Sequence, residues 1–191
     1  DEVIAFYKER IDSSKVLNLM KIKQKEYFVV SLHRQENVDS ERNIHEFVKL
    51  LNILAELYQF PIIVSTHPRT QKKINQLNVQ FDSLIQFERP FSFTDYIALQ
   101  QHSKVVLSDS GTITEESSIL NFPAINIRDS HERPEGMEEG AVMFTGMNID
   151  RIIQAINILE MQGRGQERLI KKIRDYNAPN VSDKVVRTIV S

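Results

Sequence analysis

The sequence predicts an α/β protein with a Rossmann-like, doubly wound parallel sheet. Short β-branched or aromatic runs alternate with longer helical patterns along the 191 residues. The short runs are mostly apolar throughout rather than at every second position, which is typical of strands buried on both faces. Strand–helix–strand alternation at this spacing also favours right-handed crossovers between parallel strands.

Six runs are predicted as strands, and the clearest helix lies between the first two. Apolar residues from Ile44 to Tyr58 share one face of that helix. Asp39 and Ser40 are its capping candidates, and Pro61 lies shortly beyond its end. The predicted strands are 27–32, 61–66, 84–87, 104–107, 124–127 and 141–144.

A second helix is predicted near the end of the chain, from about Ile149 to Met161, and Gly163 is expected to stop it. No internal repeat or long linker divides the sequence, so residues 1–191 are expected to form one domain. The chain starts in charged helical sequence and ends inside an amphipathic pattern. We therefore expect both ends to be cuts through a larger protein.

Composition excludes several classes of function. With 24 basic and 26 acidic residues, the net charge of −2 indicates no bulk attraction to nucleic acid or to anionic membranes. The absence of cysteine excludes disulfides, thiolate metal sites and cysteine nucleophiles, and it fits a cytoplasmic location. No His-Glu-x-x-His pattern, Gly-x-Gly-x-x-Gly pattern or Walker lysine occurs, so metal, NAD and P-loop chemistry are disfavoured.

The strongest candidate site is the loop Ser108–Thr114, where a predicted strand turns into a helix. Backbone N–H groups, a hydroxyl and the positive end of the helix dipole meet there, as in a phosphate cradle. A plain helix cap, with Ser or Asp accepting from the first-turn amides, is the alternative. That alternative explains neither Gly111, which permits close approach, nor the adjacent Glu115 and Glu116. Since a carboxylate repels phosphate, we expect Glu116 to accept hydrogen bonds from a ribose diol instead.

Two other loops follow predicted strands, where open α/β sheets bind ligands. After the first strand, Arg34 can bind phosphate oxygens and His33 can donate a proton to a leaving phosphate. A solvated loop whose histidine caps the sheet edge is the alternative. After the second strand, His67 and Arg69 can line the same cleft, although His-Pro is also a good loop breaker.

The remaining strand-end loops carry aromatic and charged side chains. Phe91 and Phe93, in the loop Glu88–Thr94, can sandwich a base or can anchor the following helix in the core. Arg128 and Arg133 can neutralise phosphate or pair with the acids around them.

Three motifs occur in a fixed order and together resemble the non-hydrolysing UDP-N-acetylglucosamine 2-epimerase family. They are His33–Asn37, Ser108–Gly111 followed by Glu115 and Glu116, and Arg128–Gly136. The resemblance runs from about Tyr27 to the end. It implies one half of a GT-B two-domain fold, the C-terminal half that holds UDP, with the active site completed by an absent N-terminal domain. It implies no metal or nicotinamide cofactor.

In the reaction that this resemblance implies, a base removes the C2 proton of the sugar while UDP leaves C1. Re-addition of UDP and protonation of C2 from the other face then give the epimer. His33 would be catalytic, at the phosphate as UDP departs. Ser110 and Gly111 would hold the diphosphate, Glu116 the ribose and residues 89–93 the uracil. The fragment should bind UDP but not turn over. The complete implied UDP site is Arg34, His67, Arg89, Pro90, Phe91, Phe93, Ser110, Gly111, Thr112, Glu116 and Arg133.

One variation points to a branch of that family. Gly111–Thr114 differs from the Gly-Gly-Ile-Gln that many members have at this place. Together with Asn121–Asn126, this variation resembles the capsular and O-antigen branch. Members of that branch act on 6-deoxy sugars, as in the formation of UDP-N-acetyl-L-fucosamine. Two other functions stay open, the donor-binding half of a GT-B glycosyltransferase and a non-catalytic nucleotide-binding module. A homodimer of the full-length protein also stays open.

Overall fold

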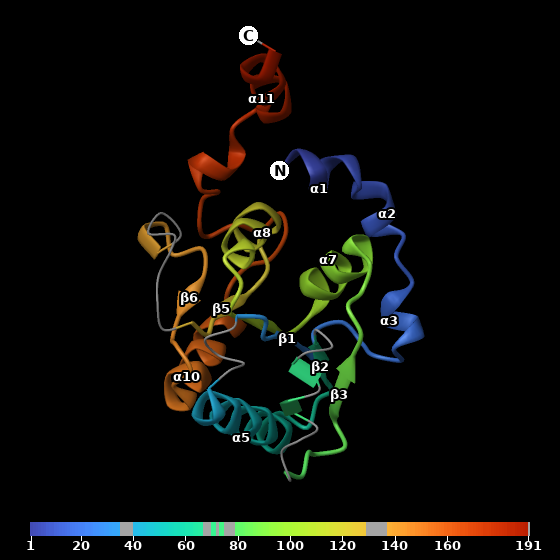
Figure 1. Ribbon diagram of the computed structural model, residues 1–191, viewed down its shortest axis with the longest axis vertical. Helices are drawn as coiled ribbons and strands as arrows, with labels where there is room; N and C mark the ends of the chain where they lie inside the picture. The colour runs from blue at the N-terminus through green and yellow to red at the C-terminus, as the bar shows by residue number, and fades with distance from the viewer. Residues whose placement is uncertain (35–39, 67–69, 72, 75–78, 129–136, 191) are drawn as a thin grey trace.

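The protein is described here by a computed structural model that covers residues 1–34, 40–66, 70–71, 73–74, 79–128 and 137–190. Its centre is one sheet of parallel strands in the order β3-β2-β1-β4-β5-β6 (Figure 1). This order confirms the predicted doubly wound α/β class. The strands are β1 (Phe28–Ser31), β2 (Ile62–Ser65), β3 (Ile85–Glu88), β4 (Val105–Ser108), β5 (Ala124–Asn126) and β6 (Met143–Phe144).

Helices cover both faces of the sheet. Figure 1 shows α5 and α10 on one face and α7 and α8 on the other, and α2 and α3 pack against α7. The helical elements are α1 (Glu2–Phe6), α2 (Lys8–Asp12), α3 (Val16–Leu19), α5 (Glu41–Tyr58), α7 (Phe93–His102), α8 (Thr112–Leu120), α10 (Ile149–Glu160), the 3-10 turn η1 (Arg174–Asn177) and α11 (Val181–Val190).

The strands are apolar throughout because successive side chains enter two different cores. In β1, Phe28 and Val30 pack with α5 and α10, whereas Val29 packs with α7 on the other face. In β4, Leu107 lies in the core on the α5 and α10 face, whereas Val106 lies in the core on the α7 face. Each of the six predicted strands is present. The first, second, fifth and sixth are shorter than predicted, and the sixth includes only Met143 and Phe144.

The ends of α5 and α10 show which of the predicted capping residues occupy those positions. Ser40 caps α5, since its hydroxyl accepts from the N–H of Asn43 at 3.3 Å, and the candidate Asp39 lies outside the described residues. The prediction that Gly163 stops α10 is wrong. That helix ends at Glu160, and the next residue, Met161, is right-handed. The N–H groups of Met161 and Gln162 bond to carbonyl oxygens three residues back, and this tight turn ends the helix without a left-handed glycine.

The connections place a topological switch point between β1 and β4. From β1 the chain moves outward through β2 to β3, and α7 then brings it back to β4, on the other side of β1. From β4 it continues outward through β5 to β6. The loops that follow β1 and β4 therefore leave the sheet side by side, where doubly wound sheets bind ligands. Within the described ranges, no helix is long and apolar enough to cross a membrane.

Candidate functional site

The carboxyl ends of β1 and β4 are joined by a direct contact between two buried serines. Ser31 and Ser108 are register partners, and their hydroxyl oxygens lie 2.7 Å apart. The Ser108 hydroxyl also accepts from the N–H of Ser110 at 3.1 Å. The bases of the two loops are thus held together at the switch point.

Asp109 ties the two loops together above these serines. Its buried carboxylate accepts from the N–H of His33, at 3.0 Å to Oδ1 and 3.2 Å to Oδ2, and from the N–H of Arg34, at 2.9 Å to Oδ2. Asp109 therefore holds the loop after β1. From the sequence alone, Asp109 is no more than a candidate helix cap. An Asp between two serines gives no sign of which backbone amides it will reach.

The start of α8 lies beside this junction. Gly111 is its N-cap residue and has ordinary right-handed dihedral angles (φ −68°, ψ −28°), so backbone conformation does not require glycine there. The hydroxyl of Ser110 accepts from the N–H of Thr112 at 3.3 Å and lies 2.9 Å from the Thr112 hydroxyl. The helix start thus presents hydroxyls and backbone N–H groups at the carboxyl edge, an arrangement that suits an anion.

Glu116 lies one turn further along α8 and is engaged by the neighbouring helix α7. Its Oε2 accepts from the side-chain amide of Gln100 at 2.8 Å. Burial raises the pKa of Glu116, whereas hydrogen bonds from Gln100 and Thr112 act to lower that pKa. The sequence analysis missed Gln100 because a glutamine in a helical pattern carries no sign of a partner on another helix.

Tyr96 extends this polar network toward the serines of the switch point. Burial raises the pKa of Tyr96 to about 12, while hydrogen bonds from Ser31 and Gln100 lower it. The charges of Glu116 and Asp109 also raise this pKa. A continuous set of polar side chains on β1, α7 and α8 therefore lies beneath the two loops.

The loop after β3 lies further along the sheet, because β3 is its edge strand. Arg89 and Pro90 are exposed, whereas Phe91 is half-buried and packs in the core on the α7 face. Phe93 is 42% exposed, and its ring centroid lies 5.9 Å from that of Tyr7, edge to face. Phe91 thus has the position expected of a core anchor, and Phe93 contacts the N-terminal segment.

The predicted site residues divide into three groups by location. His33, Arg34, Ser110, Gly111, Thr112 and Glu116 gather around the switch point. Arg89, Pro90, Phe91 and Phe93 lie at the start of α7. His67 and Arg133 lie outside the described residues. The end of β5 also reaches the site, because the Asn126 amide lies 3.5 Å from the carbonyl oxygen of Ser110.

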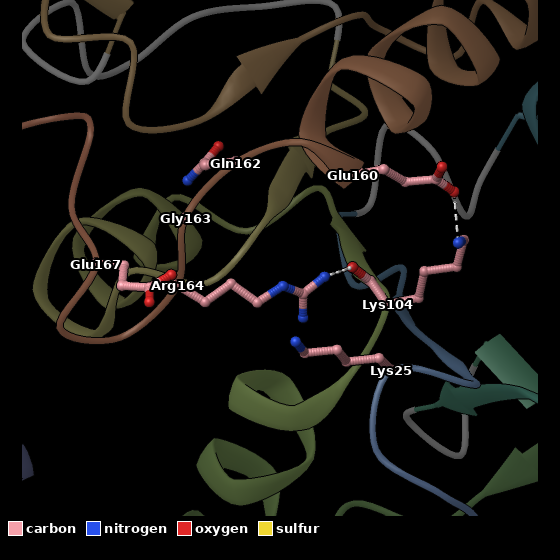
Figure 2. Close-up of a pocket in the computed structure, with 7 residues that line it drawn as sticks. All are labelled: Lys25, Lys104, Glu160, Gln162, Gly163, Arg164 and Glu167. Atoms are coloured by element: carbon pink, nitrogen blue, oxygen red, sulfur yellow. Dashed lines mark hydrogen bonds and ion pairs between the residues drawn. The ribbon is translucent and has the colours of Figure 1, made fainter.

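A pocket of about 410 Å³ lies at the opposite, amino edge of the sheet (Figure 2). Arg164 donates to the carbonyl oxygens of Ser103 and Lys104 at 2.5 and 2.6 Å, and Lys104 pairs with Glu160. These charged groups hold chain segments together. The described part of the chain also has no cluster of His, Asp and Glu that could hold a metal ion.

Comparison with known proteins gives a consistent result. A family model described as UDP-N-acetylglucosamine 2-epimerase matches residues 1–190. The UDP-N-acetylglucosamine 2-epimerase of Methanocaldococcus jannaschii is 37% identical over 139 residues, which are 70% of this chain and 38% of that protein. The structure of the Rickettsia bellii UDP-N-acetylglucosamine 2-epimerase has a TM-score of 0.87 and 39% identity, covering 99% of this chain and 50% of the other.

One of the solved structures that this chain resembles contains bound ligands. The M. jannaschii UDP-GlcNAc 2-epimerase, in complex with UDP-GlcNAc and UDP, has a TM-score of 0.82 and 28% identity, covering 95% of this chain and 50% of the other. The chain thus spans about half the length of the solved structures that it matches, and less than half of its curated relative.

Proposed function

The chain belongs to the UDP-N-acetylglucosamine 2-epimerase family, and we propose on this premise that it is the UDP-binding domain of a UDP-N-acetylhexosamine 2-epimerase, an isomerase. Residues 1–191 would form one domain of a GT-B protein, and the rest of the full-length protein would complete the active site. The proposed location is the cytoplasm. The reaction would remove the C2 proton as UDP leaves C1, and UDP would then add back at C1 while C2 is protonated from the other face.

The observation that carries this proposal is the meeting of two loops at the switch point. Arg34 comes from the loop after β1, and Ser110 and Gly111 come from the loop after β4. A diphosphate between these loops would meet a guanidinium on one side and the start of α8 on the other. His33, which is exposed beside Asp109, would donate a proton to the phosphate as UDP departs.

Glu116 is proposed to bind the ribose. Its Oε2 already accepts from Gln100, which fixes the carboxylate plane and leaves Oε1 as the oxygen for a ligand hydroxyl. The Thr112 hydroxyl hydrogen-bonds to Glu116 and also lies 2.9 Å from the Ser110 hydroxyl. UDP would replace these contacts, with its phosphate taking Ser110 and its ribose taking Glu116.

The uracil is proposed to lie against the loop 89–93. Arg89 and Pro90 are exposed there, and α7, which begins at Phe93, carries Tyr96 and Gln100 to the network under Glu116. One rigid helix would thus connect the base contact with the ribose contact. His67 and Arg133 are proposed as further UDP contacts.

The sugar is proposed to belong to the 6-deoxy branch that serves capsular and O-antigen synthesis, or to be plain UDP-N-acetylglucosamine. Asn121, part of the motif that suggests the branch, is a structural residue. It is left-handed (φ 56°), and its amide donates to the carbonyl oxygens of Gly163, Gly165 and Glu167. Thr114 is buried, whereas Thr112 is exposed. Among these residues, Thr112 is therefore the one placed to affect a ligand.

Incubating the full-length protein with UDP-N-acetylglucosamine, without an acceptor, tests the proposed activity. An epimerase releases free UDP-N-acetylmannosamine and, in deuterated water, incorporates deuterium at C2. A GT-B glycosyltransferase has the same kind of nucleotide site but needs an acceptor to consume the donor. The same incubation with a 6-deoxy UDP-N-acetylhexosamine tests the other branch, and return of both UDP-sugars unchanged, with no deuterium, would contradict the proposal.

A further inference from the structure

Asp109 occupies a position that the proposed ligand contacts leave without a role. Its carboxylate is fully buried at the end of β4, directly before the proposed phosphate ligands Ser110 and Gly111. Both of its oxygens accept backbone N–H groups from the loop after β1, at distances between 2.9 and 3.2 Å.

The hydrogen bonds to Asp109 compensate its buried charge and fix the backbone of the loop after β1. A buried carboxylate is costly unless donors compensate its charge, and hydrogen bonds that involve a charged partner are stronger than neutral ones. The donors are consecutive amides, those of His33 and Arg34. Holding two successive N–H groups fixes the direction of the backbone, and with it the points from which the imidazole and the guanidinium start.

The contacts also couple the two loops. Asp109 lies between Ser108, which contacts Ser31 at 2.7 Å, and Ser110, whose N–H bonds to Ser108 at 3.1 Å. A displacement of the Ser110 loop would therefore pull on the amides of His33 and Arg34. The loop that would hold the diphosphate and the loop that would protonate it share one buried carboxylate.

We propose that Asp109 is a positioning residue, which sets His33 and Arg34 against the phosphates of a nucleoside diphosphate held at the start of α8. This role rests on the proposed function, because it presupposes that UDP binds at the switch point. It concerns the phosphates alone. If Asp109 had a purely structural role, replacing it would instead weaken all contacts of the ligand, those to the nucleoside as well as those to the phosphates.

The variant Asp109→Asn tests this role with little change in shape. An amide presents one oxygen and one NH₂ group, so at least one of the backbone N–H groups now faces a donor. Asp82→Asn is the matched control, because exposed Asp82 accepts the N–H of Leu84 at 2.8 Å before β3, away from the switch point. Thermal unfolding of all three proteins establishes that they are folded.

The measurement is an NMR titration of each protein with UDP and, separately, with uridine, which lacks the phosphates. We expect Asp109→Asn to weaken UDP binding about tenfold, the loss of one charge-assisted contact, and to leave uridine binding unchanged. Asp82→Asn should match the wild type for both. Equal losses for UDP and uridine, or no loss for either, would overturn the positioning role.

The wild-type titration gives a second test that holds even where Asp109→Asn does not fold. The backbone amides of His33 and Arg34 should shift together with those of Ser110 and Gly111, with one dissociation constant. Shifts confined to the α8 start would overturn the role of Asp109 but leave the proposed function standing. No shift anywhere on adding UDP would instead overturn the proposed function itself, and the role of Asp109 with it.

Discussion

The side-chain amide of Gln100 donates a hydrogen bond to the carboxylate of Glu116 across 2.8 Å and so joins α7 to α8 beneath the candidate site. The carbonyl oxygen of the same amide, Gln100 Oε1, is buried without a hydrogen-bond partner in the described structure. Gln100 is itself 1% exposed. The bond to Glu116 therefore helps to keep this polar side chain in the core, together with the contact to Tyr96.

Replacing Gln100 by Leu should weaken UDP binding through Glu116. The carboxylate would lose its buried donor, and its plane would no longer be fixed for the ribose. We expect a loss of about 1.5 kcal/mol, near the lower end for a hydrogen bond to a charged group, measured by calorimetric titration. Gln101→Leu, at the next position of α7, is the control and should bind UDP normally. Equal affinity of the Gln100 variant and the wild type would argue against the link.

The raised pKa of Glu116 should make stability depend on pH in a defined direction. Burial is the main cause of the raised pKa, so the folded state holds this proton more tightly than the unfolded state. The contribution of Glu116 to the free energy of unfolding should fall as pH rises from its ordinary pKa through its raised pKa, and it should level off above.

Glu116→Gln should remove that pH dependence. We expect the variant to be more stable than the wild type at neutral pH and to bind UDP more weakly, because an amide oxygen accepts less strongly from a diol than a carboxylate does. Urea unfolding at several pH values, together with calorimetry, measures both effects. A wild type that gains stability as pH rises through this range, relative to Glu116→Gln, would contradict the assignment.

Arg164 should affect stability without affecting the ligand site. Its guanidinium donates to the carbonyl oxygens of Ser103 and Lys104 at the amino edge of the sheet. Figure 2 shows Arg164 reaching toward Lys104. Arg164→Lys loses this two-pronged contact, and we expect a cost of about 2 kcal/mol in the free energy of unfolding. UDP affinity of the folded variant should equal that of the wild type. A strong loss of UDP binding would instead indicate that the ligand uses the amino-edge pocket.

The sheet could be predicted from the sequence because its signal is local. Runs such as Phe28–Val30 and Val105–Leu107 are apolar at every position, which is typical of a strand buried on both faces. Ser40 was found in the same way, since a cap acts on amides three residues away. The end of α10 is predicted to within one residue, Met161 against Glu160, whereas its stop is not, because the helix closes with a tight turn rather than at Gly163.

The site was predicted in its outline but not in its connections. The loop position of Ser110 and His33 follows from where strands end. By contrast, Asp109 bonds residues 75 and 76 positions away in the sequence, and Gln100 reaches Glu116 from another helix. Such pairings depend on strand order, which places β1 beside β4 and which the sequence analysis did not derive.

Calorimetric titration of UDP into this chain, its Ser110→Ala variant and its Glu116→Ala variant is the most direct test of the switch-point site. The account gives saturable UDP binding that each substitution weakens by about 1.5–3 kcal/mol, the value of one hydrogen bond to a charged group. Asp82→Asn serves as the control and should bind like the wild type. UDP binding of unchanged affinity in both alanine variants would show that the nucleotide binds elsewhere and would contradict the account.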